Sequence, residues 1–326
     1  ITPDYSEVAK LTDIWLHPKQ GTDAALAMAF GHVILREFHV DNPSQYFQDY
    51  CRQYSDMPML VRLNPLADGS YATDRFLRAA DLANGVDENN NPEWKTLAID
   101  EGSQQIVVPR GSVGFRWGEK GKWNIEERDS QGRDTKLSLS LSGKHDAVVE
   151  VSMPYFGGVE HEKWTSNAFE EILKKRIPAK RLMLADGSET WVATVYDLLL
   201  AQYGVDAGLG GNYVTRDFEA NVPGTPAWQE KITGVSRRDV IQIAREFART
   251  ADKTRGRSMI IVGAAMNHWY HNDMNYRGLI NMLVMCGCVG QSGGGWAHYV
   301  GQEKLRPQSG WAPLAFALDW SRPPRQ

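Results

Sequence analysis

The chain has 326 residues, of which 42% are hydrophobic and 23% are charged, which is enough for about two domains with sizeable cores. Its net charge of -4 at pH 7 gives no reason to expect nucleic acid or an anionic membrane as a direct partner. No apolar stretch reaches the roughly 18 residues of a membrane helix, so we expect no direct membrane insertion. Cys51, Cys286 and Cys288 cannot all pair, which favours a reducing compartment such as the cytoplasm.

The first residues predict a strand, helix and strand unit that is entered midway. The chain opens without an initiator Met or a leader, so we expect an internal piece of a longer protein. Residues 13–16 are typical of a short strand that ends at Pro18. Apolar residues between 26 and 38 then recur on one face, which predicts a helix that starts at Thr22 or Asp23.

Residues 62–159 predict a β-rich surface insertion, which we interpret as a packing or subunit-contact region and not as a place for chemistry. Within it, Leu137, Leu139 and Leu141 alternate with polar residues in the manner of a strand. After the insertion, a hairpin is expected to turn at residues 186–187, and a helix is expected over about 196–203.

The last third of the chain alternates helices with an apolar strand. Ser236 is expected to cap a helix, residues 259–262 predict a strand buried on both faces, and another helix runs through residues 279–283. This alternation predicts an α/β fold with a mostly parallel sheet flanked by helices. We expect one α/β domain over residues 1–255, with the insertion inside it, and part of a second over residues 256–326.

In an open α/β sheet, ligands bind just beyond the carboxyl ends of the strands, so the segments after the strands are the candidate sites. The first such segment is Gln20, Gly21, Thr22 and Asp23, at the start of a predicted helix. Backbone N–H groups there suit an anionic oxygen, and the Asp23 carboxylate could accept hydrogen bonds from N1 and N2 of a guanine. Alternatively, Thr22 only caps the helix and Asp23 only complements its dipole.

The second segment follows the strand at residues 259–262 and contains Met266, Asn267, His268 and His271. Two histidines and an amide are costly to bury in a turn unless they contact a polar ligand, although such a histidine can also be a satisfied structural residue. No third ligand stands at a spacing typical of zinc, so zinc is not expected.

The third segment is the glycine run that includes Gly293 and Gly294, whose backbone amides could approach phosphate oxygens closely. It has neither a Walker lysine nor a dinucleotide fingerprint, and alone it is a weak signal. The neighbouring Cys286 and Cys288 could indicate metal or redox chemistry, but we interpret them as buried, unreactive thiols.

Residues 2–23, 233–248 and 263–302 together resemble the molybdopterin oxidoreductase superfamily in order and spacing. More narrowly, residues 15–23, 114–123, 267–271 and 290–307 resemble the catalytic alpha subunits of respiratory nitrate reductases. The resemblance implies a molybdenum bis(molybdopterin guanine dinucleotide) centre that reduces nitrate to nitrite. It also implies that no residue of this chain ligates the metal.

The resemblance assigns roles to the candidate residues. Gln20, Gly21, Thr22 and Asp23 would contact a guanosine end of the cofactor. Met266, Asn267, His268 and His271 would lie beside the pterin and the metal, with His268 nearest to molybdenum as an orienting or proton-supplying group. Gly293 and Gly294 would line the pocket at phosphate or pterin level.

The resemblance also implies parts that this chain lacks. The ligands of a 4Fe-4S cluster and the aspartate that binds molybdenum would precede Ile1, and a cofactor-binding barrel would follow Gln326. We therefore expect the isolated chain to be inactive and largely free of cofactor. The implied partners are an iron-sulfur beta subunit and a haem-containing gamma subunit at the cytoplasmic face of the inner membrane. The alternative is a non-catalytic guanine-dinucleotide-binding or assembly module.

Overall fold

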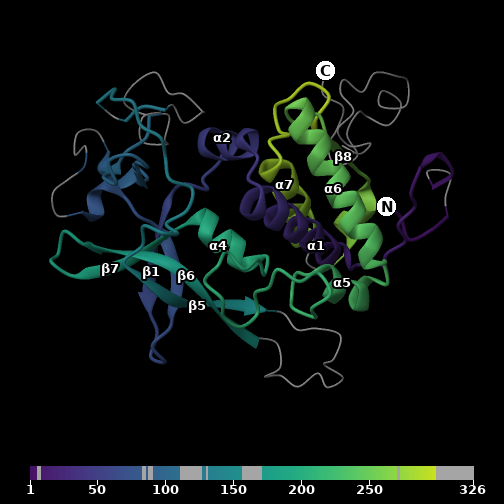
Figure 1. Ribbon diagram of the computed structural model, residues 1–326, viewed down its shortest axis with the longest axis horizontal. Helices are drawn as coiled ribbons and strands as arrows, with labels where there is room; N and C mark the ends of the chain where they lie inside the picture. The colour runs from purple at the N-terminus through teal and green to yellow at the C-terminus, as the bar shows by residue number, and fades with distance from the viewer. Residues whose placement is uncertain are drawn as a thin grey trace, which may run out of the picture.

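The computed structural model has a helical part and a β-barrel part, which lie side by side in Figure 1. It describes residues 1–5, 9–82, 86, 91–110, 127–129, 131–155, 171–269 and 272–298. Within these ranges, every helix is too short or too polar to cross a membrane. The stretch 114–123 and residues 299–326 lie outside the described residues, as does His271.

Helix α1 is the centre of the helical part, because it is buried along almost its whole length and packs against α5, α6 and α7. It starts at Asp23, as predicted, and its Phe30, Val33 and Ile34 are at most 1% exposed. The predicted helices near residues 196–203, after Ser236 and through residue 279 are confirmed. The helices are α1 (Asp23–Leu35), α2 (Gln45–Tyr54), α4 (Val195–Gln202), α5 (Pro226–Thr233), α6 (Arg237–Thr254) and α7 (Asn272–Met285), and the short helical segments are η1 (Ala9–Leu11), η2 (Arg36–Asp41), η3 (Ala79–Asp81), η4 (Pro92–Trp94) and η5 (Ala264–His268).

Hydroxyl side chains start most of these helices. The side chains of Ser44, Thr194, Thr225 and Ser236 each accept a hydrogen bond from a backbone N–H in the first turn that follows. Such caps satisfy donors that have no partner inside the helix. Helix α5 ends at Gly234, whose φ of 78° is the left-handed conformation that favours glycine.

The barrel part is a closed sheet with the strand order β1-β2-β5-β6-β7. Its neighbouring strands are antiparallel, apart from one parallel pairing of Tyr71 in β2 with Val151 in β5. The predicted mostly parallel sheet is therefore not confirmed, and the sheets of the described residues are mixed. The predicted hairpin at residues 186–187 joins β6 to β7 and is confirmed. The strands are β1 (Leu60–Pro65), β2 (Tyr71–Phe76), β3 (Ala98–Ile99), β4 (Ile106–Val107), β5 (Ala147–Tyr155), β6 (Glu171–Met183), β7 (Glu189–Thr194), β8 (Met259–Val262) and β9 (Gly295–His298).

Helix α4 connects the barrel to the helical part. At its start, the buried Asp197 carboxylate accepts hydrogen bonds from Thr194 Oγ1, Ser140 Oγ and the backbone N–H of Leu141. At its end, the buried Lys175 of β6 donates to the carbonyl oxygens of Ala201 and Gln202. Both ends of α4 are thus fixed to the β-rich part by side chains that satisfy helix-terminal groups.

Strands β8 and β9 form a separate parallel pair, with α7 connecting them. The prediction that residues 259–262 are buried on both faces is wrong, because Met259 is 46% and Ile261 is 80% exposed. The predicted strand at residues 13–16 is also wrong, since these residues form bends and irregular chain. Among the described residues, β8 pairs with β9 alone, so its other edge has no strand partner. Its exposed side chains, Met259 and Ile261, are apolar.

The predicted domain boundaries remain predictions. The proposed insertion at residues 62–159 contains β2 to β5, while β6 and β7 of the same barrel follow it in the chain. Helix α7, from the proposed second unit, packs directly on α1 from the first.

Candidate functional site

The turn of residues 19–22, before α1, is held by hydrogen bonds to one carbonyl oxygen, that of Lys19. The backbone N–H and the hydroxyl of Thr22 both donate to the carbonyl of Lys19, at 3.3 and 2.6 Å. The N–H of Lys19 in turn donates to the carbonyl of Thr233 at the end of α5, at 2.9 Å. Gln20 and Gly21 are exposed at the tip, and Gly21 has a φ of 76°. The turn is thus rigidly held while its tip faces outward.

Asp23 opens α1 in a partly buried position. Burial raises the pKa of its carboxyl, and a hydrogen bond from its own backbone N–H opposes this shift. Within the described ranges, no other residue donates to this carboxylate. The Thr22 side chain makes no cap hydrogen bond to α1. The simpler reading of Thr22 as a side-chain cap is therefore wrong, and the Asp23 carboxylate has acceptor positions that no other described residue fills.

The segment after β8 reaches this turn. Gly263 is followed by η5 (Ala264–His268), in which His268 is exposed and Met266 is half-buried. Trp269 then lies over Gly21, where an added Cβ would stand 3.3 Å from the indole ring. Residues 19–23 and 264–269 are called the α1–η5 corner below. The structure brings these two predicted segments together, with Asn267 inside η5 and His271 outside the described residues.

The glycine run lies elsewhere. Gly295 pairs with Met259 at the start of β8, whereas η5 follows Val262 at its end. Because the strands are parallel, Gly293 and Gly294 lie at the opposite end of the strand pair from His268. An added Cβ at Gly294 would stand 2.0 Å from the carbonyl oxygen of Gly256, so this glycine serves a close backbone contact. Gly293 faces open space. The structure does not bring these two glycines to the α1–η5 corner.

Two residues that the sequence did not single out lie at the carboxyl end of β9. His298 pairs in register with Val262, and its Nε2 is 3.2 Å from the hydroxyl of Tyr276 in α7. Trp296 stacks on His298. Trp296 and His298 are two residues apart, as side chains on one face of a strand are. The sequence analysis interpreted this region by its glycines and did not predict the strand.

The three cysteines are buried. Burial raises the pKa of Cys51 to about 12 and that of Cys288 to about 11, and it also raises the pKa of Cys286. Thiols in this state are poor nucleophiles and poor metal ligands. The predicted burial of Cys286 and Cys288 is confirmed, and their lack of reactivity stays a prediction. In the part of the chain that the structure describes, no group of three or more His, Cys, Asp or Glu side chains could hold a metal ion.

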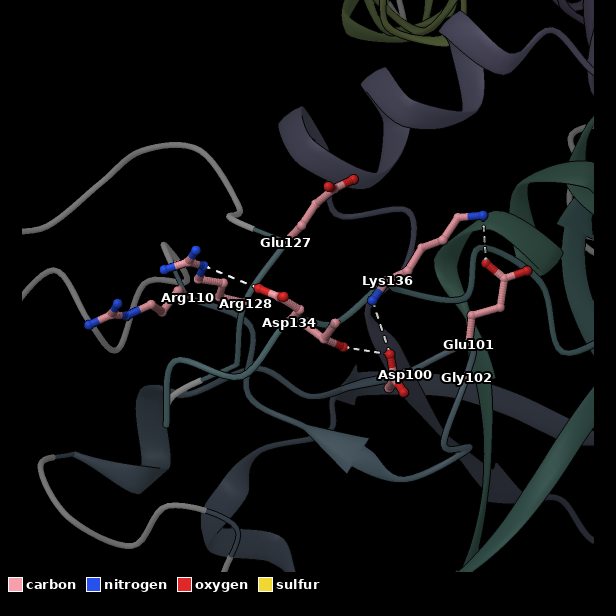
Figure 2. A pocket seen from close by; sticks show the side chains of 9 residues that line it. Asp100, Glu101, Gly102, Arg110, Glu127, Arg128, Asp134 and Lys136 are labelled. Carbon is pink, nitrogen blue, oxygen red and sulfur yellow. Dashed lines mark hydrogen bonds and ion pairs between the residues drawn. The ribbon is translucent and has the colours of Figure 1, made fainter.

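A cavity of about 1090 Å³ lies in the β-rich part and contains none of the predicted residues. Figure 2 shows that charged side chains of both signs line it. They pair with one another: Lys136 Nζ is 3.2 Å from Glu101, and Arg128 Nε is 3.4 Å from Asp134. The volume alone therefore gives no ligand-binding role.

Comparison with known proteins places the chain in context. The family model described as molybdopterin oxidoreductase matches residues 1–318. The chain is 64% identical over its whole length to the respiratory nitrate reductase 2 alpha chain of Escherichia coli strain K12. It is 43% identical over its whole length to the nitrate reductase alpha chain of Bacillus subtilis strain 168. Over 97% of its length, it is 28% identical to the perchlorate reductase subunit alpha of Dechloromonas aromatica. The chain spans only 26%, 25% and 27% of these relatives, respectively.

Proposed function

Because the chain belongs to the molybdopterin oxidoreductase family, whose cofactor is a molybdenum-pterin group, we propose that its α1–η5 corner is part of the cleft for that cofactor. The observation that carries this proposal is the contact of Gly21 with Trp269, which joins two segments about 250 residues apart in the chain. We propose further that the cofactor is the bis(molybdopterin guanine dinucleotide) form. The whole protein would be the catalytic subunit of a respiratory nitrate reductase.

The residues of the corner fit such a group. Asp23 offers a half-buried carboxylate that lacks a donor from any other described residue, which suits the N–H donors of a guanine. Gly21 lets the Trp269 ring pack closely on the turn, which holds residues 20–22 against the segment after β8. These residues and the first turn of α1 would hold the guanosine end. Met266, Asn267, His268 and His271 would lie toward the pterin.

The cofactor, when bound, supplies two-electron oxygen transfer from an oxyanion. The residues of this chain position it and handle protons. His268 is exposed at the end of η5, so its imidazole can reach the substrate side of the corner. Reduction of nitrate to nitrite consumes protons, and a histidine side chain can deliver one near neutral pH. We therefore assign His268 an orienting or proton-supplying role.

Nitrate is the proposed substrate because the more similar relatives bear nitrate reductase names at 64% and 43% identity. The relative named for perchlorate is 28% identical. The names of the relatives as alpha chains also support an assembly with other subunits. We propose an iron-sulfur beta subunit, a haem-containing membrane gamma subunit, a 4Fe-4S cluster elsewhere in the full protein, and a location at the cytoplasmic face of the inner membrane.

The second candidate function is a non-catalytic guanine-dinucleotide-binding or assembly module. The free acceptor positions of Asp23 serve this function equally well, because base recognition needs no redox chemistry. Nitrate turnover separates the two candidates, since only the reductase consumes electrons from a reduced dye.

Replacement of His268 tests the proposal. In the full-length subunit, we expect His268→Ala to lower nitrate-dependent oxidation of reduced viologen by roughly a hundredfold, the typical contribution of a positioned proton donor. His145→Ala, on the barrel side, is the matched control and should leave turnover unchanged. Molybdenum content is measured alongside. Full turnover in the His268 variant at full molybdenum content would remove this residue from the mechanism.

A further inference from the structure

Helices α1 and α7 are parallel neighbours, and their amino ends lie close together. Three contacts fix their relative position. Before the helices, Gly21 lies under Trp269, and in the middle an added Cβ at Gly278 would stand 2.7 Å from the Cβ of Ala27. Beyond α1, His39 Nε2 is 3.0 Å from the carbonyl oxygen of Met285. The first turns of both helices are therefore neighbours at the α1–η5 corner.

Asn275 lies in this junction with an unpaired donor. It precedes Gly278 by three residues, so it lies on the face of α7 that packs on α1. The contact of Gly278 with Ala27 places Asn275 level with Ala24, next to Asp23. Its side chain is buried, with 3% exposure, and its Nδ2 has no hydrogen-bond partner among the described residues.

Helix geometry directs the Asn275 side chain toward the corner. In an α-helix, the Cα–Cβ bonds tilt toward the amino end, so the Asn275 amide covers the turn that precedes it. That direction leads to the amino ends of α1 and α7. A buried amide without an acceptor costs free energy, so such a group calls for a specific explanation.

A second amide on the same helix provides a contrast. Asn281, two turns farther along α7, donates from its Nδ2 to the hydroxyl of Tyr203 at 3.2 Å. The protein thus satisfies the amide that is remote from the corner and leaves unpaired the one that faces it.

We propose that Asn275 Nδ2 donates to the oxo group of a 2-amino-4-oxopyrimidine ring, while Asp23 accepts the N–H and NH₂ donors on the same edge of that ring. The inference rests on the proposed function. It adds the donor that completes recognition, because Asp23 alone cannot read an oxo group. Guanine and pterin share this edge, so both ends of the cofactor are possible sources.

The test uses the full-length subunit purified with its cofactor. Asn275→Leu removes the donor at similar volume, and Asn281→Leu is the matched control on the same helix. We expect Asn275→Leu to reduce molybdenum and released GMP per protein at least threefold, with no loss of thermal stability in the cofactor-free protein. Asn281→Leu should lower thermal stability and leave the cofactor content unchanged, because it breaks a hydrogen bond within the protein.

Titration of the cofactor-free subunit identifies the source. Loss of one hydrogen bond should weaken binding by about tenfold, for GMP if the ring is guanine and for neopterin if it is the pterin. The 2-aminopurine ribonucleotide lacks the oxo group, so its affinity should not change.

The outcomes separate this inference from the proposed function. If Asp23→Asn lowers cofactor content and Asn275→Leu does not, the role of Asn275 is overturned while the guanosine site stands. If Asp23→Asn retains full cofactor content, the guanosine site at the corner is itself overturned. Lower stability of Asn275→Leu without loss of cofactor would show a merely structural amide and would also overturn the inference.

Discussion

The cavity in the β-rich part and the α1–η5 corner differ in how their polar groups are satisfied. In the cavity, the Asp100 carboxylate accepts hydrogen bonds from Thr135 and Ser103, and neighbouring charges form ion pairs. At the corner, Asp23 lacks a donor from any other described side chain, and the amide nitrogen of Asn275, near the start of α7, has no partner among the described residues. The protein itself satisfies the first set of groups. The second set is smaller, but its polar groups lack hydrogen-bond partners that a ligand could supply. Unsatisfied polar groups therefore indicate a binding site better than cavity volume does.

The largest expected effect concerns acid stability, in which buried groups of the two parts act in opposite directions. Burial lowers the pKa of His32 and of His39 in the helical part to about 4. Burial raises the pKa of Asp197, at the start of α4, to about 6. The histidine contribution is present above pH 6.5 and is lost as the pH falls through 4. The Asp197 contribution is present below pH 3.8 and is lost as the pH rises through 6.

Because two histidines oppose one aspartate, we expect the free energy of unfolding to fall between pH 6.5 and 4. His39→Gln keeps a hydrogen-bond donor but cannot titrate. It should reduce the loss between pH 7 and 4 by about 3 kcal/mol, measured by urea unfolding. His17→Gln, at an exposed position, is the control and should not change the loss. If both variants lose stability as the unsubstituted protein does, the buried histidines do not control acid unfolding.

Much of the helical part could be predicted from the sequence, because its signals are local. The stripe of apolar residues after Thr22 and the cap at Ser236 each define a helix through neighbours in the chain. The hairpin at residues 186–187 is equally local. These elements need no information about the rest of the molecule.

The failures have the opposite cause. Leu137, Leu139 and Leu141 alternate like a strand and are buried. Among the described residues they have only an isolated bridge, from Asp100 to Leu137, because no described segment continues the pairing. The glycine run was assigned to the cofactor pocket by the family resemblance, and that assignment stays a prediction. Its position at the other end of β8 depends on strand direction, which composition does not contain. Asn275 escaped notice because an unpaired amide is visible only in three dimensions.

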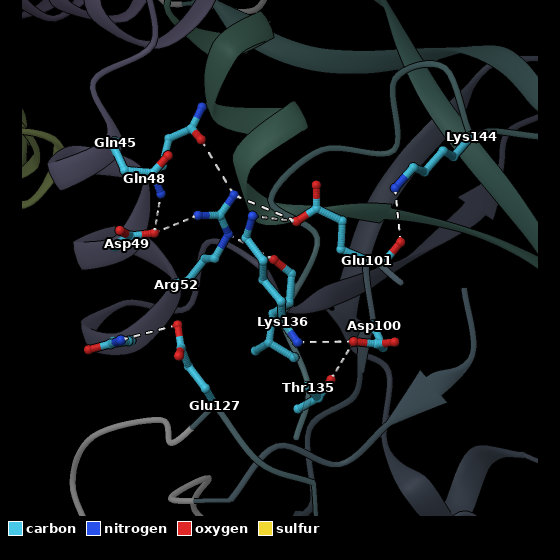
Figure 3. Close-up of polar contacts among 12 residues, drawn as sticks. Gln45, Gln48, Asp49, Arg52, Asp100, Glu101, Glu127, Thr135, Lys136 and Lys144 are labelled. Carbon is cyan, nitrogen blue, oxygen red and sulfur yellow. Dashed lines mark hydrogen bonds and ion pairs between the residues drawn. The ribbon is translucent and has the colours of Figure 1, made fainter. Parts of the chain in front are cut away.

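A second test addresses the junction between α2 and the β-rich part, where pairing within the protein is densest. Figure 3 shows the buried Arg52 side chain extending from α2 toward Glu101, with Asp49 and Gln48 beside it. Its Nε also donates to the carbonyl oxygen of Leu137 at 3.0 Å. We expect Arg52→Met to lower the free energy of unfolding by about 2 kcal/mol, because a buried carbonyl loses its donor and the Asp49 carboxylate loses its cation.

Arg128→Met is the matched control, since its pair with Asp134 is largely exposed and should contribute less than about 0.5 kcal/mol. Both values come from urea unfolding. Neither variant should change the molybdenum content of the full-length subunit, because both positions are in the part where the protein pairs its own charges. A loss of molybdenum in Arg52→Met at a temperature where the protein stays folded would contradict the separation of the two regions.

The smallest expected effect on stability gives the sharpest test of the corner itself. Gly21 and Gly69 have φ values of 76° and 82°, so alanine at either position should cost about 1 kcal/mol of unfolding free energy. Only at Gly21 does the new Cβ meet a neighbour, the Trp269 ring at 3.3 Å, whereas Gly69 has open space. Displacement of this ring by a few tenths of an ångström should reduce cofactor content to roughly half in Gly21→Ala, because a binding site tolerates little loosening. Gly69→Ala should retain full content at equal stability. Equal molybdenum content in the two variants would mean that the contact of Gly21 with Trp269 only packs the fold and that the cofactor lies elsewhere.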